Sequence, residues 1–204
     1  MSNKGLLFVF SGPSGVGKGS IMKEFTSRYP EENFISISAT TRKPRPGEEH
    51  GVHYYFISQD EFTNLVDNDG MLEYANFSGN YYGTPKAPVY KTLEEGKNVF
   101  LEIEVQGAAK VRKICPEAIF IFVMPPDMNE LSKRLIGRNT EDQKTIELRL
   151  SNAKREIEEA KNYDYIIVNN TIDEAVDELV AIVSSSKRTY ANMKNFIDEV
   201  LKNA

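Results

Sequence analysis

The amino-acid sequence predicts an α/β sandwich built around a parallel sheet, and three observations lead to this fold class. Apolar runs of strand length alternate with helical patterns along most of the chain, as they do in successive βαβ units. A glycine-rich loop joins the first apolar run to the first helical pattern. Residues 39–97 interrupt the alternation with turn residues and aromatic side chains. We therefore expect residues 1–38 and 91–204 to form a core domain and residues 39–90 to form an inserted lobe.

The elements of the core are expected in a regular order. Residues 5–11 form a continuous apolar run, which is typical of a strand buried on both faces of a parallel sheet. A helix is expected over residues 18–29, because Pro30 cannot continue it. The later strands are expected at residues 34–38, 99–105, 119–124 and 165–168. The later helices are expected at residues 106–114, 129–137, 145–162 and 172–202.

The inserted segment has a different pattern. Aromatic residues such as Tyr54, Phe62 and Tyr81 alternate there with glycine and proline, which predicts short antiparallel strands in a separate mixed sheet. Residues 138–147 are polar and lie between two expected helices, so we interpret them as a lid. The expected architecture is thus a core with two additions, a small lobe and a lid.

The composition restricts the compartment and the partners of the chain. It has 204 residues, of which 40% are apolar, enough to bury a core. The formal net charge of −5 repels nucleic acid and anionic lipid, so neither a nucleic-acid partner nor a membrane partner is expected. Any anion site must then be a local cluster of arginine and lysine. The single Cys115 cannot form an internal disulfide, which favours a reducing compartment, and we expect a cytoplasmic protein.

The glycine-rich loop has the composition of a phosphate-binding loop. Gly12, Gly17 and Lys18 have the Walker A spacing, after an expected strand and before an expected helix. Glycine lets backbone N–H groups turn inward around a polyphosphate, and the start of the helix adds its positive end. Lys18 is expected to reach the β- and γ-phosphates and to act in catalysis. The expected ATP-binding residues of the loop are Gly12, Pro13, Ser14, Gly15, Val16, Gly17, Lys18, Gly19 and Ser20.

The sequence of the same loop does not decide which residues bind the metal ion. The position after Lys18 is usually a serine or threonine whose hydroxyl helps to hold Mg²⁺, whereas this chain has Gly19 there and Ser20 next. Mg²⁺ is therefore expected to enter as MgATP, held mainly by phosphates and water, with Ser20 as a candidate ligand. The alternative interpretation is a glycine-rich turn with a chance lysine, and the placement of the loop after a strand argues against it.

A second candidate anion site lies in the inserted segment. Arg42 and Arg45 are three positions apart, and Pro44 and Pro46 stiffen the segment around them. Two guanidinium groups in a rigid loop can form a bidentate clamp for one phosphate, and Tyr54 can add a hydroxyl donor. On charge alone, a solvated basic turn is an equally good interpretation.

These residues, together with motifs elsewhere in the chain, resemble the guanylate kinase family over about residues 5–185. The matching motifs are Thr40-Thr41-Arg42, Arg45, Glu48, Gly51, Tyr54, Phe56, Leu72-Glu73-Tyr74-Ala75, residues 77–84, Gln106-Gly107, Pro125-Pro126, residues 134–138 and residues 167–170. The resemblance implies a P-loop NTPase-type three-layer sandwich with a GMP-binding lobe and a lid. It also implies that ATP and GMP are the partners and that ATP phosphorylates GMP, and dGMP, in purine metabolism.

The resemblance implies roles for residues of the lobe. The implied clamp on the GMP phosphate consists of Arg42, Arg45, Tyr54 and Tyr82. The implied guanine readers are Ser38, Glu73 and Thr84. The chemistry supports Glu73, because one carboxylate can accept hydrogen bonds from both N1–H and the 2-amino group of guanine, whereas adenine has no hydrogen on N1. Without the resemblance, Glu73 would be interpreted as an ordinary surface residue.

Two acidic residues lie at the end of an expected buried strand. Glu102 and Glu104 flank Ile103, and the alternation of a strand places both carboxylates on one face, at the edge where α/β sheets bind ligands. The family more often has aspartate at both positions. We assign Glu104 to contacts with GMP or with the water on Mg²⁺, and Glu102 to a metal-side or structural role.

Three arginines and one amide are implied to act on ATP. Arg134 and Arg138 are four positions apart on an expected helix and so share a face, and Arg149 lies on the next helix. They resemble the family's arginines that fold over the triphosphate, and with Lys18 they are the expected catalytic residues. The alternative is solvated helix charge. Asn169 matches the adenine-side loop of the family.

Three other functions remain as alternatives. A guanylate-kinase-like binding module would bind peptides, but such modules tend to lack the intact loop and the Lys18 found here. A phosphate-loop kinase for another acceptor would differ mainly at the three guanine readers. A GTP-hydrolysing switch needs base-reading and water-positioning motifs that the sequence does not contain. The oligomeric state is open, and a homodimer is compatible with the amphipathic C-terminal segment.

Overall fold

The structure is a computed structural model that describes residues 4–77, 79–137 and 143–202. Its larger sheet has five strands, and every pair of neighbours is parallel. In spatial order the strands are β2 (Asn33–Ile35), β7 (Asn98–Glu102), β1 (Leu7–Ser11), β8 (Ile119–Met124) and β9 (Tyr165–Val168). The parallel sheet predicted from the apolar runs is confirmed.

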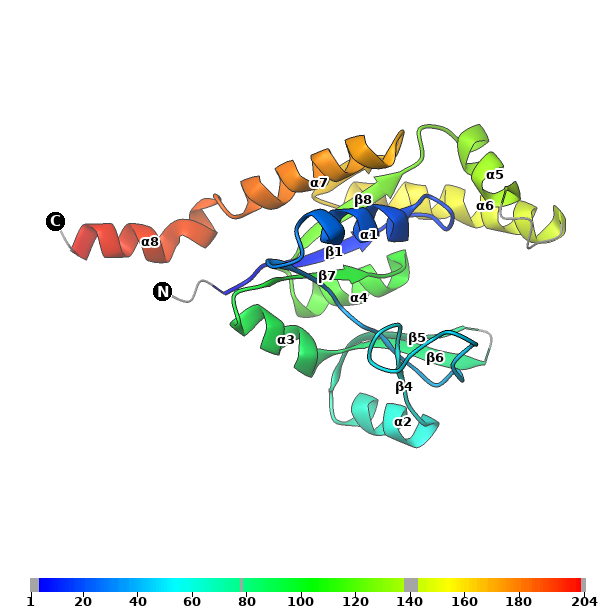
Figure 1. Ribbon diagram of the computed structural model, residues 1–204, viewed down its shortest axis with the longest axis horizontal. Coiled ribbons are helices and arrows are strands. Elements are labelled where there is room, and N and C mark those ends of the chain that lie inside the picture. The colour runs from blue at the N-terminus through cyan, green and yellow to red at the C-terminus, as the bar shows by residue number, and fades with distance from the viewer. Residues whose placement is uncertain (1–3, 78, 138–142, 203–204) are drawn as a thin grey trace.

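Helices cover both faces of this sheet, which makes three layers (Figure 1). On one face lie α1 (Lys18–Arg28) and α7 (Ile172–Ser186), and on the other lie α3 (Lys86–Glu94) and α4 (Val105–Ile114). Strand alternation explains the arrangement, because β1 sends Phe8 and Phe10 to the first face and Leu7 and Val9 to the second. All the side chains of β1 are therefore buried, as its continuous apolar run predicts.

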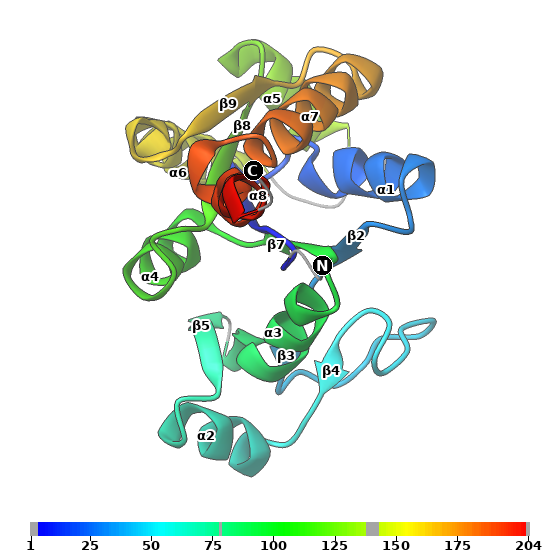
Figure 2. The same cartoon turned by 90° about the vertical axis from the view of Figure 1, so that its left-hand side faces the viewer.

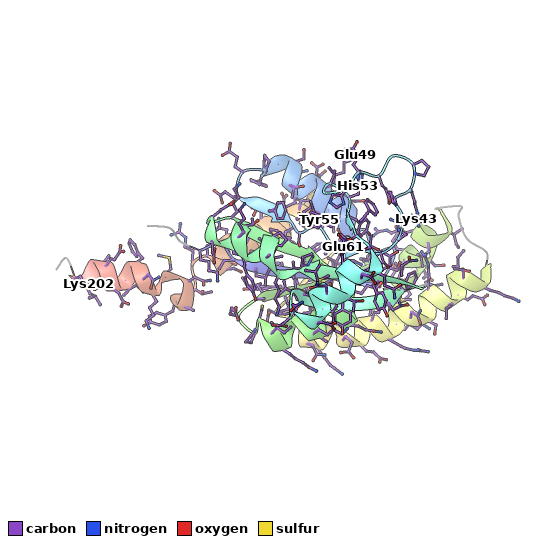
Figure 3. The ribbon with its side chains drawn as sticks, turned by 90° about the horizontal axis from the view of Figure 1, so that it is seen from below. Lys43, Glu49, His53, Tyr55, Glu61 and Lys202 are labelled. Atoms are coloured by element: carbon purple, nitrogen blue, oxygen red, sulfur yellow. The ribbon has the colours of Figure 1, made fainter. Side chains whose placement is uncertain are left out.

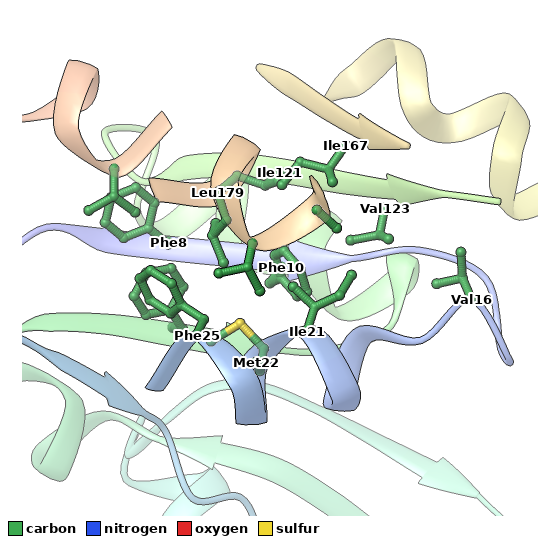
Figure 4. Close-up of a cluster of buried hydrophobic side chains, with 14 residues drawn as sticks. Phe8, Phe10, Val16, Ile21, Met22, Phe25, Ile121, Val123, Ile167 and Leu179 are labelled. Carbon is green, nitrogen blue, oxygen red and sulfur yellow. The ribbon is translucent and has the colours of Figure 1, made fainter. Parts of the chain in front are cut away.

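The first face has an aromatic centre (Figure 4). The ring of Phe100 stacks on that of Phe8 with centroids 4.7 Å apart, and Phe25 of α1 packs edge-on against Phe100 at 5.2 Å. These contacts join α1 to the two central strands β1 and β7.

The inserted segment forms a second sheet, which lies apart from the first (Figure 2). Its order is β4 (Tyr55–Phe56), β3 (Ala39–Thr40), β6 (Asn80–Pro85) and β5 (Met71–Phe77). The β3–β4 pair is parallel and the other pairs are antiparallel, so the sheet is mixed, as predicted. The predicted limits of the core and the lobe stay a prediction.

Two helices were missed: α3 and a helix of the lobe whose start signal the sequence contains. Helix α2 (Gln59–Asp67) begins with a capping box, in which Ser58 Oγ accepts from the backbone N–H of Glu61 and the Glu61 carboxylate accepts from that of Ser58. A serine followed three residues later by a glutamate is a recognised helix start. Phe62 of α2 then packs beneath the second sheet with Ala39 and Met71.

Three predicted elements need correction. Strand β7 ends at Glu102, because Glu104 is the N-cap of α4, so the strand predicted to residue 105 is too long. The C-terminal segment is two helices, α7 and α8 (Tyr190–Lys202), and α8 extends away from the sheet (Figure 1). Residues 138–142 of the predicted lid lie outside the described residues, and residues 143–147 are the first turns of α6 (Gln143–Glu158).

The remaining described helices complete one end of the core. Helix α5 (Met128–Ile136) packs on α6 through Leu131, Leu135 and Ala153, and a short 3₁₀ turn, η1 (Glu159–Asn162), follows α6. In the described part of the chain, no helix combines the length and the apolar character needed to cross a lipid bilayer.

Candidate functional site

The glycine-rich loop leaves the carboxyl end of β1 and turns directly into α1. Lys18 is the first residue of α1, and its Nζ donates to the carbonyl oxygens of Gly12 (2.6 Å) and Pro13 (3.2 Å). Its ammonium group therefore folds back over the loop. Gly12 has a φ of 152°, and a Cβ there would lie 2.4 Å from the carbonyl oxygen of Val123, so a side chain cannot replace its hydrogen.

Asn169 and Arg134, two residues predicted to contact ATP, donate hydrogen bonds to the backbone of this loop. The carbonyl oxygen of Val16 accepts from Asn169 Nδ2 (2.7 Å) and from Arg134 Nη1 (3.4 Å). Arg134 also donates from Nη2 to the carbonyl oxygen of Asn169 (3.0 Å) and from Nε to Glu130 (3.0 Å). The side chains expected on the triphosphate and the adenine thus contact loop backbone. Asn169 is buried, and its Oδ1 has no hydrogen-bond partner among the described residues.

A cleft of about 320 Å³ opens between the two sheets, and both contribute to its lining. Its residues are Ser38, Tyr54, Glu73, Ala75, Phe77, Tyr82, Gly83, Glu102, Ile103 and Glu104. Six predicted site residues meet here, although they come from distant parts of the chain. Sequence reasoning did not identify Ala75, Phe77 and Ile103 as part of the lining, because an apolar wall has no motif of its own.

At one end of the cleft, Glu73 and Thr84 form a buried polar pair. The Thr84 hydroxyl donates to Glu73 Oε1 at 2.7 Å, and only 8% of the surface of Glu73 is exposed. A register shift between Met71 and Glu73, where β5 pairs with β6, turns the carboxylate inward. Burial raises the pKa of Glu73, while the Thr84 hydrogen bond and the charge of Lys110 lower it. A ligand that donates hydrogen bonds to this carboxylate would therefore stabilise its ionised form.

Near Tyr54, the Glu48 carboxylate holds the guanidinium of Arg42. Both terminal nitrogens of Arg42 donate to the Glu48 carboxylate at 2.9 Å, and the backbone N–H of Arg45 donates to the same carboxylate at 2.7 Å. These hydrogen bonds, with Arg42 first, lower the pKa of Glu48 to about 2. The Arg42 guanidinium carbon also lies 5.5 Å from the centroid of the Tyr54 ring. Sequence reasoning placed Glu48 in the family signature but did not find this partnership.

The other residues of the predicted clamp lie in two places: Tyr54 and Tyr82 line the cleft, whereas Arg45 lies on an exposed loop. The rings of Tyr54 and Tyr82 lie edge to face with centroids 6.1 Å apart, and burial raises the pKa of Tyr54, which keeps its hydroxyl a neutral donor. The side chain of Arg45 is exposed on the loop between β3 and β4. Figure 3 shows Lys43, Glu49 and His53 on this same loop, where His53 Nδ1 accepts from the Glu49 backbone at 3.1 Å.

Glu102 and Glu104 both line the cleft, and Glu102 also lies beside the glycine-rich loop. Ser11 Oγ donates to the carbonyl oxygen of Ile103 at 2.8 Å, which ties the segment between Glu102 and Glu104 to the end of β1. Glu102 lines the cleft, and its Oε1 would lie 3.6 Å from a Cβ at Gly19. Surrounding protein atoms raise the pKa of Glu102 even though its side chain is exposed to the open cleft, and the charge of Lys18 opposes the rise.

One further acid at the loop was missed. Glu156 of α6 accepts from the backbone N–H of Ser14, and burial raises its pKa while the charge of Lys18 lowers it. Its position in a polar helix gave no sequence signal, since only the packing of α6 brings it to the loop. Among the described residues, no group of three or more histidine, cysteine, aspartate or glutamate side chains is arranged to hold a metal.

Three predicted residues remain. Arg149 is half-buried on α6, Ser20 is exposed in the first turn of α1, and Arg138 lies outside the described residues. Helix α5 ends at Ile136, and the helical face predicted to be shared by Arg134 and Arg138 stays a prediction, because Arg138 lies outside the described residues.

The chain was compared with known proteins. A family model described as "Guanylate kinase" matches residues 4–186. A guanylate kinase of Latilactobacillus sakei is 52% identical over 91% of each chain, and one of Clostridioides difficile is 48% identical over 98% of this chain and 97% of its own. The crystal structure of guanylate kinase from Anaplasma phagocytophilum superposes with a TM-score of 0.73 at 32% identity, covering 92% of this chain and 89% of that one. Because the family model spans most of the chain and the first two relatives are about half identical to it, this chain belongs to the guanylate kinase family.

Proposed function

We propose that this chain transfers the γ-phosphoryl group of ATP to the phosphate of GMP, producing ADP and GDP. The observation that carries the proposal is the cleft between the sheets. Its lining includes the buried Glu73, and Thr84 donates to that carboxylate. Glu102 lines the same cleft and lies beside Gly19 of the phosphate loop. One cavity is therefore lined both by the proposed base-reading group and by a carboxylate that lies beside the loop proposed to hold the donor phosphates.

Glu73 is the group that would select guanine. Its buried carboxylate gains most from a base that presents two adjacent N–H donors, as guanine does with N1–H and the 2-amino group. Adenine would place a lone pair against the same carboxylate and leave a buried acceptor unpaired. Thr84 and Ser38 would complete the contacts to the base, since Thr84 fixes the carboxylate and Ser38 lines the cleft.

The acceptor phosphate would bind at Arg42, Arg45, Tyr54 and Tyr82. Glu48 orients the Arg42 fork beside Tyr54, whose ring contacts Tyr82. A guanidinium has five N–H donors, so Arg42 retains donors for a phosphate while it is held by Glu48. Arg45 would reach the phosphate from its exposed position on the loop.

The donor side would act by positioning and charge. Transfer between phosphates passes through a metaphosphate-like state with charge on its equatorial oxygens, which Lys18, Arg138 and Arg149 would stabilise. Arg134 and Asn169 would act mainly by holding Val16 and the loop in shape. No general base is required, because the acceptor phosphate oxygen is already ionised.

Mg²⁺ is the expected cofactor, and the residues present suit it. Ser20 and Glu102 offer only oxygen ligands near the loop, and Gly19 places no side chain between Glu102 and the phosphates. Bound as MgATP, the ion would supply positive charge to the phosphate oxygens. Among the described residues no protein cage for it exists, in keeping with a site completed by phosphates and water.

Deoxy-GMP is the expected second acceptor, because the proposed contacts address the base and the phosphate and none of them addresses the 2′-hydroxyl. The acidic chain and its single thiol favour the cytoplasm as the compartment.

The test compares GMP, AMP, CMP and UMP side by side in a coupled assay of ADP release with MgATP. GMP should exceed the other acceptors by several orders of magnitude in kcat/KM, because of the unpaired carboxylate that they would leave. Lys18→Met is the negative control for donor-side chemistry. A preference for another monophosphate would overturn the assignment of the acceptor, and the absence of ADP release with all four would favour a binding module.

A further inference from the structure

Glu73 lies against a helix that packs on the larger sheet. Glu73 lies on β5 of the lobe, whereas Gly107 lies in the first turn of α4, which covers the larger sheet. A Cβ built at Gly107 would lie 2.9 Å from Glu73 Oε2, 3.3 Å from Cδ and 3.5 Å from Cγ. The absence of a side chain at this position is thus what lets the carboxylate rest against α4.

The two carboxylate oxygens have different surroundings. Oε1 accepts from Thr84 at 2.7 Å, and Oε2 faces Gly107 at the N-terminal end of the helix. That end carries partial positive charge, which favours an ionised carboxylate. Glu104, the N-cap of α4, opposes this effect with a negative charge.

Lys110, one turn further along α4, holds the neighbouring backbone. Its Nζ donates to the carbonyl oxygen of Tyr74, the residue after Glu73, and lies 5.0 Å from the centroid of the Tyr74 ring. Of the charged groups that act on Glu73, Lys110 lowers its pKa and Glu104 raises it. Lys110 therefore ties α4 to β5 and counteracts the effect of burial on the carboxylate.

We propose that Gly107 and Lys110 are positioning residues that fix the guanine-reading geometry of Glu73 from the opposite side of the cleft. Gly107 sets the position of the carboxylate because it has no side chain. Lys110 holds the backbone next to Glu73 and favours the ionised form of its carboxylate. This inference rests on the role proposed for Glu73 in reading guanine. It makes base preference depend on α4, which carries no proposed base contact.

The first test is a double-mutant cycle with Gly107→Ala, Glu73→Gln and the double variant. The probes are GMP and IMP, which lacks the 2-amino group. An added methyl at 107 meets the end of the Glu73 side chain and no backbone atom, so the fold should persist while the carboxylate is displaced, and circular dichroism checks this. KM for GMP should rise about tenfold or more, and the preference for GMP over IMP should fall by a similar factor.

The cycle separates the two levels of the proposal. If Gly107 acts through Glu73, the alanine should have little further effect once Glu73→Gln is present, so the two effects should not add. Additive effects, or an unchanged preference in Gly107→Ala beside a large loss in Glu73→Gln, would overturn the positioning role alone. No loss of preference in Glu73→Gln would instead overturn the proposed reading of guanine by Glu73.

The second test uses Lys110, which is exposed and whose substitution does not threaten the fold. Lys110→Met should raise the pKa of Glu73, so that KM for GMP begins to increase on acidification at a higher pH than in the parent enzyme. Lys110→Arg should restore the parent profile. Lys113→Met removes an equal charge further along the exposed side of α4 and should leave the profile unchanged. Superimposable profiles for Lys110→Met and the parent would refute the role of Lys110.

Discussion

The residues of the proposed site fall into two groups, one for the phosphate donor and one for the acceptor. Lys18 lies over the phosphate loop, where it donates to Gly12 and Pro13, whereas Arg42 is held by Glu48 in the lobe. The two cations therefore have no partner in common among the hydrogen bonds described. Each should act on its own substrate.

This division predicts different kinetic effects for two substitutions. Lys18→Met should reduce kcat by roughly 10²-fold or more while leaving GMP affinity largely intact, because it removes charge from the transferring phosphoryl group. Arg42→Met should weaken GMP binding by roughly tenfold or more, because it removes charge-assisted hydrogen bonds to the acceptor phosphate. Steady-state kinetics and calorimetric titration with GMP measure both effects.

A neighbouring lysine supplies the control for Arg42. Lys43 is exposed on the same loop (Figure 3), so Lys43→Met changes the loop charge without touching the proposed clamp and should leave GMP affinity nearly unchanged. A comparable loss of GMP affinity in Lys18→Met and Arg42→Met would contradict the division of roles.

At the scale of elements, the two ends of the chain differ in how they are supported. Strand β1 is buried along its whole length between two helical layers, whereas α8 has no buried residue in its described part. Phe196 and Leu201 of α8 expose 54% and 68% of their surface. The homodimer considered from the sequence stays a prediction, and α8 carries the exposed apolar surface that it would use.

Two phenylalanines should show this difference directly. Phe100→Ala removes a fully buried ring that contacts Phe8 and Phe25, and should cost about 3–5 kcal/mol in the free energy of unfolding. Phe196→Ala makes the same chemical change on α8 and should change that free energy by no more than about 0.5 kcal/mol in the monomer. Urea unfolding followed by circular dichroism measures both. A large loss from Phe196→Ala would show that α8 is packed in solution.

At the scale of the whole molecule, the cleft lies between the larger sheet, whose strand β1 leads into the proposed donor loop, and the second sheet, which carries the proposed acceptor site. Phosphoryl transfer in the presence of water requires that the cleft exclude water before the reaction. In the part of the chain that the structure describes, no strand of one sheet pairs with a strand of the other, so the lobe can move against the core with its own sheet intact.

We therefore expect GMP and a non-hydrolysable ATP analogue together to reduce the radius of gyration measured by small-angle X-ray scattering. Each ligand alone should produce a smaller change, because closure is completed by contacts from both sides. Arg42→Met at a GMP concentration that saturates only the parent enzyme should show less compaction. An unchanged radius of gyration with both ligands bound would count against closure.

Features that depend on local chemistry were predictable from the amino-acid sequence. A continuous apolar run, a glycine pattern and a following helix suffice to specify β1 and the phosphate loop, because each acts over a few neighbouring residues. The same holds for the order of the parallel strands along the chain and for the motifs of the lobe. The break between α7 and α8, by contrast, has no sequence signal, because residues 187–189 include neither proline nor glycine.

Which of these residues meet, and how, depends on the packing of the folded chain. It placed Arg134 and Asn169 against the backbone of Val16, paired Arg42 with Glu48, and set Gly107 against the carboxylate of Glu73. Spacing along a chain does not encode contacts between residues that lie far apart in it. Such contacts depend on how the sheets and helices pack, and this packing determines whether a charged side chain faces a ligand, another side chain or the backbone.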